Sequence, residues 1–248
     1  MFITDFDGVL CDSVQECLLV TYNAYRKLQS AAAPRALSLD AIDPAQQARF
    51  RQLRPYLKGA EDFIPIFIAI AEQIPITNQQ AFDALRSSHH DQLLTYQQAF
   101  YAERDYLLQH AKELWLRLNP LFDGIKETLQ QCASFEQIHI LTTKRQEDVL
   151  EIFQYQGIPF PADHVTYMKA VGKSQKLLEI LQANGAAAAD SVYLEDQVDF
   201  LIASQKQQIG SYLVEWGYVS DEQKALARQH AIPIIGMAEF RTLLGRFQ

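Results

Sequence analysis

The sequence has few cysteines and no long apolar run. Its 248 residues include only three cysteines, Cys11, Cys17 and Cys132, an odd number without the close spacing of a metal site. This count excludes a disulfide framework and fits reduced thiols. The longest apolar run, residues 63–71, is interrupted by Pro65 and is far shorter than the roughly 18 residues that a membrane span needs.

The sequence also has fewer basic than acidic residues. The chain has 22 Lys and Arg against 30 Asp and Glu, a net charge of −8, and we find no basic stripe. Such a chain repels nucleic acid and anionic lipid at long range. The first residues, MFITDFDG, are acidic where a signal peptide needs basic and then apolar residues. We therefore expect a soluble cytoplasmic protein, a monomer or homodimer, that binds neither nucleic acid nor membrane.

Short apolar runs alternate with helical patterns through much of the chain. The runs are residues 2–4, 138–141, 165–167, 192–194, 211–214 and 232–235. Alternation of this kind predicts βαβ units and a parallel sheet with helices on both faces. Between the first two runs the pattern is helical only, with helices expected at 14–29, 46–53, 60–73, 78–96 and 98–118. The predicted fold is α/β, a Rossmann-like parallel-sheet core of residues 1–13 and 119–248 with an inserted all-helical domain, residues 14–118.

Two acids, Asp5 and Asp7, directly follow the first apolar run. Alternate residues of an extended backbone point the same way, so both carboxylates can face the carboxyl end of the sheet, where α/β proteins bind ligands. Two such close carboxylates favour a bound cation or a shared proton. The same acids would also suit a turn after a strand.

The segment that contains them, DFDGVLCDS at residues 5–13, resembles the first motif of the haloacid dehalogenase superfamily. Similarity to its members with a helical cap, such as phosphoglycolate phosphatase and β-phosphoglucomutase, implies a haloacid dehalogenase-like core and a cap at 14–118. It also implies that Asp5 attacks phosphorus to form a phosphoaspartyl intermediate. Asp7 would then act as general acid and base.

The second motif of this family is an apolar strand that ends in Thr or Ser. Here residues 138–141 lead to Thr142, which the resemblance assigns to the phosphoryl oxygens, with Thr143 and Lys144 as lesser candidates for substrate binding. A Thr that caps the following helix would give the same pattern.

The third motif is a Lys between the nucleophile and the phosphate. Lys173, which follows a Gly and opens a helical pattern, matches it best, with Lys169 and Lys176 as rivals. A cation at a helix start is disfavoured by the helix dipole, so Lys173 calls for a nearby anion.

The fourth motif holds Mg²⁺ after another apolar strand. Asp196 is the best candidate ligand beside Asp5 and Asp7, and Glu195 or Asp199 could assist, because Mg²⁺ prefers carboxylate oxygens. The chain departs from the family pattern here: Glu195 replaces a common Gly, and Phe200 stands where a second acid is usual.

Within the helical insert, Arg51, Arg54 and Lys58 form a basic cluster that could bind a phosphate or carboxylate at the far end of a substrate. A solvated surface would look the same. The resemblance implies a Mg²⁺-dependent phosphatase acting on a small phosphorylated metabolite. A phosphomutase of the same superfamily, and a degenerate binding protein with little turnover, remain the alternatives.

Overall fold

The computed structural model describes residues 1–168 and 172–248, and the chain divides into two compact units. One unit consists of Met1–Asp12 with Pro120–Gln248, and the other of Ser13–Asn119. Each junction lies one residue from the boundaries expected from the sequence. Lys169, a rival of Lys173 in the sequence, lies outside the described residues.

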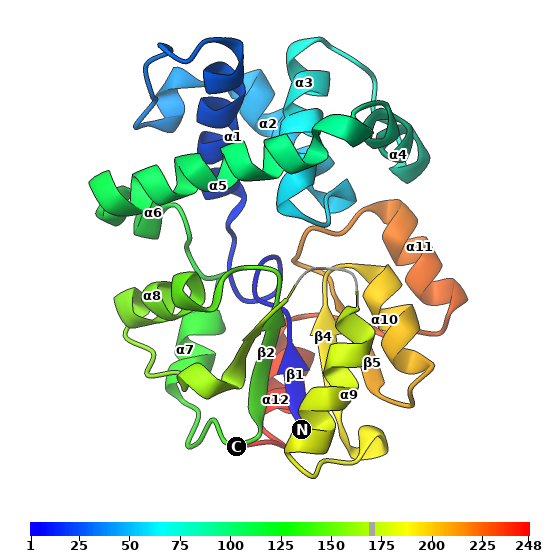
Figure 1. Ribbon diagram of the computed structural model, residues 1–248. Coiled ribbons are helices and arrows are strands. Elements are labelled where there is room, and N and C mark those ends of the chain that lie inside the picture. The colour runs from blue at the N-terminus through cyan, green and yellow to red at the C-terminus, as the bar shows by residue number, and fades with distance from the viewer. Residues whose placement is uncertain (169–171) are drawn as a thin grey trace. The chain divides into compact units, whose positions relative to one another are not determined.

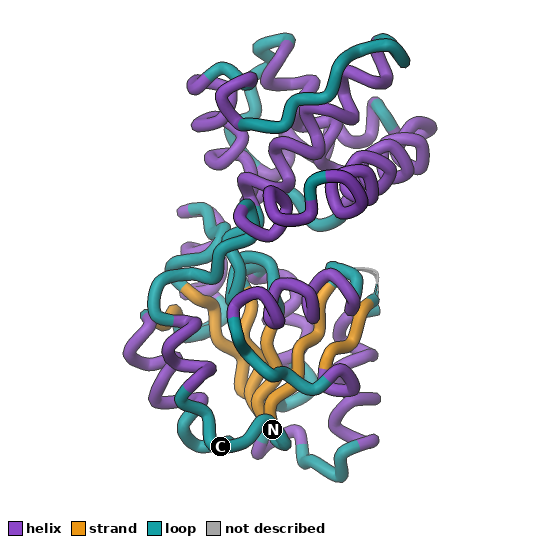
Figure 2. Tube along the Cα trace, turned by 90° about the vertical axis from the view of Figure 1, so that its left-hand side faces the viewer, coloured by secondary structure: helices purple, strands orange, loops and turns teal. Residues whose placement is uncertain are grey.

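The first unit is built on a parallel sheet with the strand order β3-β2-β1-β4-β5-β6 (Figures 1 and 2). The strands are β1 (Phe2–Thr4), β2 (Ile138–Thr142), β3 (Val165–Tyr167), β4 (Val192–Glu195), β5 (Gly210–Val214) and β6 (Ile234–Ile235). All neighbouring pairs run parallel, and β1 lies between β2 and β4. The strand order reverses at β1 and β4, and α/β proteins bind ligands at the carboxyl ends of strands at such a point.

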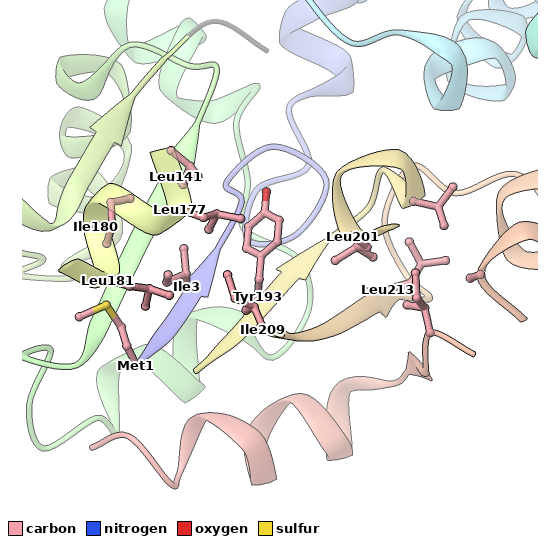
Figure 3. Packing of buried hydrophobic residues seen from close by; sticks show 13 residues of the cluster. Met1, Ile3, Leu141, Leu177, Ile180, Leu181, Tyr193, Leu201, Ile209 and Leu213 are labelled. Carbon is pink, nitrogen blue, oxygen red and sulfur yellow. The ribbon is translucent and has the colours of Figure 1, made fainter. Parts of the chain in front are cut away.

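Helices lie on both faces of this sheet, and successive β1 side chains point to opposite faces. Phe2 packs edge-on against Phe240 at a centroid distance of 5.8 Å, whereas Ile3 belongs to a buried cluster with Leu177 and Leu181 (Figure 3). Burying one large aliphatic side chain stabilises a fold by roughly 1.5–3 kcal/mol. The helices of this unit are α7 (Ile125–Gln130), α8 (Gln146–Gln156), α9 (Lys173–Ala183), α10 (Val198–Gln205), α11 (Asp221–Gln229) and α12 (Met237–Leu244).

The second unit is helical throughout its regular elements. It contains α1 (Val14–Gln29), α2 (Pro44–Leu53), α3 (Phe63–Ala71), α4 (Gln79–Ser88), α5 (Leu93–His110) and α6 (Lys112–Arg117), with short 3-10 turns between some of them. The expected helix break near residue 97 was wrong: the chain breaks instead at 89–92 and again at Ala111. His89 and Ala111 leave helical backbone angles without a Gly or Pro, so neither break has a strong local signal.

A buried ion pair ties together the two ends of this helical unit. Arg104 of α5 forms a bidentate pair with Glu16 of α1, with both N···O distances 2.8 Å, and the indole N–H of Trp115 donates to the same carboxylate at 3.1 Å. Glu16 lies in the first helix after residue 13 and Trp115 in the last helix before residue 119. The network therefore joins the segments where the chain enters and leaves the unit.

Among the described residues, no helix combines the length and the apolar character that crossing a membrane would require.

Candidate active site

The carboxylate of Asp5 is held in one orientation at the end of β1. Its backbone N–H donates to the carbonyl of Leu194 at 3.0 Å, which extends the pairing of β1 with β4 by one residue. Its Oδ1 accepts the N–H of Phe6 at 2.8 Å, and its Oδ2 lies 3.1 Å from Lys173 Nζ. Burial raises the pKa of Asp5 to about 7; the charge of Glu195 adds to the rise and that of Lys173 opposes it. Asp5 is thus a buried and poorly hydrated carboxylate.

Lys173 is the first residue of α9, and its ammonium group lies between two acids. The side chain is 1 % exposed, and Nζ is 2.5 Å from Glu195 Oε1 as well as close to Asp5. Burial alone would lower the pKa of Lys173, but the charges of Asp5 and Glu195 raise it above its usual value. The ring centroid of Phe200 lies 4.8 Å from Nζ. Lys173 is therefore a charged ammonium fixed by two carboxylates and one aromatic face.

Glu195, the last residue of β4, is fully buried and hydrogen-bonded at both carboxylate oxygens. Oε1 accepts the hydroxyl of Tyr193 at 3.0 Å in addition to Lys173, and Oε2 accepts the N–H of Asp196 at 2.8 Å. Burial alone would raise the pKa of Glu195, yet Lys173 and the hydrogen bonds from Asp196 hold it below its usual value. The negative charge of Glu195 is thus directly paired with the ammonium group of Lys173.

A group of three acids meets at the ends of β1 and β4. Carboxylate oxygens of Asp5, Glu195 and Asp196 all lie within 4.8 Å of one another, and the three residues are buried. The Asp196 carboxylate packs directly on Gly8, where an added Cβ would lie 2.0 Å from its Oδ2. Gly8 also has a φ of 88°, which favours glycine. The sharp turn after β1 therefore leaves just enough room for Asp196.

Asp7 and Thr142 are linked through Lys144. Lys144 Nζ is 3.1 Å from Asp7 Oδ1, and the backbone N–H of Lys144 donates to Thr142 Oγ1 at 3.1 Å. Thr142 is the last residue of β2 and is fully buried. The predicted catalytic groups Asp5, Asp7, Thr142 and Lys173 therefore all lie at the carboxyl ends of β1 and β2 or at the start of α9.

No family model matches the chain, and no curated protein matches it in sequence. Several solved structures are similar in fold. A haloacid dehalogenase-like hydrolase from Streptococcus pneumoniae has a TM-score of 0.61 and 15 % sequence identity, over 100 % of this chain and 97 % of that one. The chain has the haloacid dehalogenase-like fold. The predicted fold class, an α/β core of parallel strands with a helical insert, is confirmed.

Two further structures support this haloacid dehalogenase-like fold over almost the whole chain. A predicted phosphatase from Clostridium acetobutylicum has a TM-score of 0.58 and 15 % identity, covering 99 % of this chain and 97 % of that one. A predicted phosphoglycolate phosphatase from Haemophilus somnus has a TM-score of 0.57 and 14 % identity, covering 98 % and 97 %. At these identities the likeness establishes the fold.

Some predicted site residues lie apart from the acidic group of this fold. Asp199 is exposed in the first turn of α10 and is not one of the three clustered acids, whereas Glu195 is one of them. Lys176 is partly exposed and pairs with Glu179, which leaves Lys173 as the described lysine beside Asp5. Thr143 is half-buried in the bend after β2.

The three residues of the basic cluster in the helical unit differ in how deeply they are buried. Arg54 is buried; it donates to the carbonyl of Leu57 at 3.1 Å and lies over the ring of Phe63 at 5.3 Å. These contacts give Arg54 a structural role within its own unit. Arg51 is exposed and Lys58 half-buried, so their assignment to substrate binding stays a prediction.

Three contacts of the site were not predicted from the sequence. The hydroxyl of Tyr193 bonds Glu195 two residues later on the same face of β4, which strand alternation alone could have indicated. The backbone N–H of Tyr218 donates to Asp196 Oδ2 at 3.2 Å. Lys144 reaches Asp7 across 137 residues, and no local pattern signals that pair.

Proposed function

We propose that the protein is a Mg²⁺-dependent phosphatase that hydrolyses a small-molecule phosphate monoester through a phosphoaspartyl intermediate on Asp5. The observation that carries this proposal is the position of Asp5. Its carboxylate is oriented by Phe6 N–H and Lys173, at the end of the central strand and beside Glu195 and Asp196. A structural acid in a turn has no need of two further buried acids and a buried lysine.

The reaction has two steps, each with a defined proton transfer. An oxygen of Asp5 attacks phosphorus, the bond from phosphorus to the ester oxygen breaks, and Asp7 gives its proton to the leaving oxygen. Water then attacks the phosphoaspartyl group, Asp7 takes the proton of that water, and Asp5 is released as a carboxylate. Asp7 follows Asp5 by two residues, so both side chains face the same end of the sheet.

Two groups of this chain can hold the transferring oxygens. Lys173 Nζ already contacts Asp5, so it can balance the charge of the nucleophile and of the incoming phosphate together. Thr142 Oγ1 accepts a hydrogen bond from Lys144 N–H, which leaves the hydroxyl proton of Thr142 for a phosphoryl oxygen.

The donor set fits Mg²⁺. The site contains four acids and two lysines, so it carries a surplus of two negative charges when all six groups are ionised. The acids are Asp5, Asp7, Glu195 and Asp196, and the lysines are Lys144 and Lys173. Asp5 and Asp196 would hold the ion, with the backbone carbonyl of Asp7 as the resemblance implies and Glu195 alongside. A bound Mg²⁺ supplies positive charge that offsets the repulsion between a carboxylate and a phosphate.

The test is phosphate release from p-nitrophenyl phosphate and a panel of small phosphate esters, phosphoglycolate and hexose phosphates among them. Each ester is assayed with Mg²⁺ and with EDTA, using wild type, Asp5→Asn and, as a matched control, Asp221→Asn on the exposed start of α11. We expect Mg²⁺-dependent release by wild type and Asp221→Asn, and none by a folded Asp5→Asn. Release that Asp5→Asn retains would refute the mechanism.

Absence of release from every ester would refute the phosphatase assignment. Isomerisation of a hexose phosphate without release would then identify a phosphomutase. Binding of an ester without either reaction would identify a binding protein.

A further inference from the structure

The side chain of Lys144 is fully buried, although lysine is among the residues least often buried. Removing an ammonium group from water is unfavourable by several kcal/mol unless a partner compensates. Its Nζ contacts Asp7 Oδ1 at 3.1 Å, and the Asp7 side chain is 16 % exposed. Lys144 therefore approaches the predicted acid and base from the protein interior, while Asp7 retains access to the outside.

The backbone around Lys144 is fixed on both sides. The carbonyl of Thr142 accepts the N–H of Met168 at 2.9 Å, and Thr142 Oγ1 accepts the N–H of Lys144. Arg145, the next residue, forms a two-point contact with Asp148 in the first turn of α8, at 3.1 and 3.3 Å. The ammonium of Lys144 is thus attached to a segment with little freedom to move.

We propose that Lys144 is a positioning residue for Asp7: its ammonium group fixes the orientation in which the Asp7 carboxylate serves as general acid and base. This inference rests on the proposed phosphatase function. An Asp side chain rotates about two bonds, and contact with a buried ammonium group restricts that rotation. A reacting group displaced by 1 Å can lose about 100-fold in rate.

Lys144 itself loses no proton in this scheme. The proton of Asp7 passes to the ester oxygen as the bond from phosphorus to that oxygen breaks, and the proton of the hydrolytic water returns to Asp7. Lys144 remains an ammonium group throughout. Its effect therefore depends on Asp7, unlike that of a lysine that binds the substrate's phosphate, and this difference can be measured.

The test compares two esters that differ in their need for a proton. p-Nitrophenolate is stable as an anion and leaves without protonation, whereas an alkoxide such as that of glycerol phosphate needs the proton of Asp7. The ratio kcat/KM reports the steps up to the first phosphoryl transfer, so it isolates this need. We expect Lys144→Met to lower kcat/KM for the alkyl ester by about 10- to 100-fold more than for p-nitrophenyl phosphate. Lys206→Met, on an exposed residue after α10, should change neither.

A double-mutant cycle separates positioning from substrate binding. If Lys144 acts through Asp7, adding Lys144→Met to Asp7→Asn causes no further loss for either ester. An equal loss for both esters that persists in the Asp7→Asn background would overturn the inference and assign Lys144 to the phosphate. Unchanged kinetics of Lys144→Met would overturn it as well.

The test also covers a variant that does not fold and a wild type without activity. If Lys144→Met does not fold, Lys144→Gln, which also removes the charge, provides the same comparison of the two esters. If wild type releases phosphate from no ester of the panel, the proposed function is refuted and this inference with it. If wild type is active and the two losses are equal, the positioning role alone is refuted.

Discussion

Replacing Lys173 by methionine should destabilise the protein strongly, because Lys173 separates buried acids. Its side chain is 1 % exposed and that of Glu195 is 0 % exposed, and both Asp5 and Glu195 contact its Nζ. Removing one partner of a buried ion pair typically destabilises a protein by about 3–5 kcal/mol, since the other charge stays buried. Lys173→Met should therefore lower the free energy of unfolding by that amount.

The same helix offers a matched control. Lys176 forms an ion pair with Glu179 whose side chains are 38 % and 50 % exposed. Exposed pairs contribute about 0–1 kcal/mol, so Lys176→Met should lower the free energy of unfolding by less than about 1 kcal/mol. Both variants remove a lysine from α9, so the difference between their losses in free energy of unfolding reports the effect of burying the ion pair.

The assay is urea denaturation near neutral pH in EDTA, which keeps Mg²⁺ from compensating for the lost charge. Adding Glu195→Gln to Lys173→Met removes one of the stranded acids, so the double variant should lose less than the sum of the two single losses. Equal losses for Lys173→Met and Lys176→Met, or strict additivity in the cycle, would refute the account of this ion pair.

Three further changes test other parts of the structure. Burial lowers the pKa of His139 to about 4 from 6.5, so protonation favours the unfolded chain as the pH falls through this window. Wild type should lose up to about 3 kcal/mol more than His139→Leu between these pH values, and parallel curves of unfolding free energy against pH would contradict this. Arg104→Met leaves Glu16 buried without its bidentate partner and should lower the free energy of unfolding in urea by about 3–5 kcal/mol; a loss below about 1 kcal/mol would argue against the ion pair. Gly8→Ala places a Cβ 2.0 Å from Asp196 Oδ2, so phosphate release should fall by about 100-fold or more, and wild-type release would show that the turn tolerates a side chain.

The sheet was predictable from the sequence because its signal is local and repeated. A buried parallel strand shows as a short apolar run, and the expected runs correspond to the six strands of the described sheet. The acids at strand ends were predictable for the same reason, since the topology of a parallel sheet brings its carboxyl ends together. The helix boundaries at 89–92 and Ala111 were not, because neither break contains Gly or Pro.

Contacts between side chains that are far apart in the sequence could not be predicted. The role of Glu195 was left open against Asp199, and only the three-dimensional arrangement places Glu195 on Lys173 and leaves Asp199 exposed. In the sequence, Phe200 stands where a second acid is usual. In the structure, its ring lies over the ammonium group of Lys173. Such pairings depend on side-chain rotamers and on loops that meet across the fold. Neither can be predicted from the spacing of residues in the sequence.

The most direct test of the proposed function is to trap the covalent intermediate. Wild type is mixed with the best ester of the panel and Mg²⁺, quenched in acid within one turnover, and digested for mass spectrometry. We predict that one phosphoryl group is attached to the peptide that contains Asp5, at Asp5, and that the modification is absent with EDTA. Turnover of the ester by wild type without any phosphoryl group on Asp5 would contradict the account.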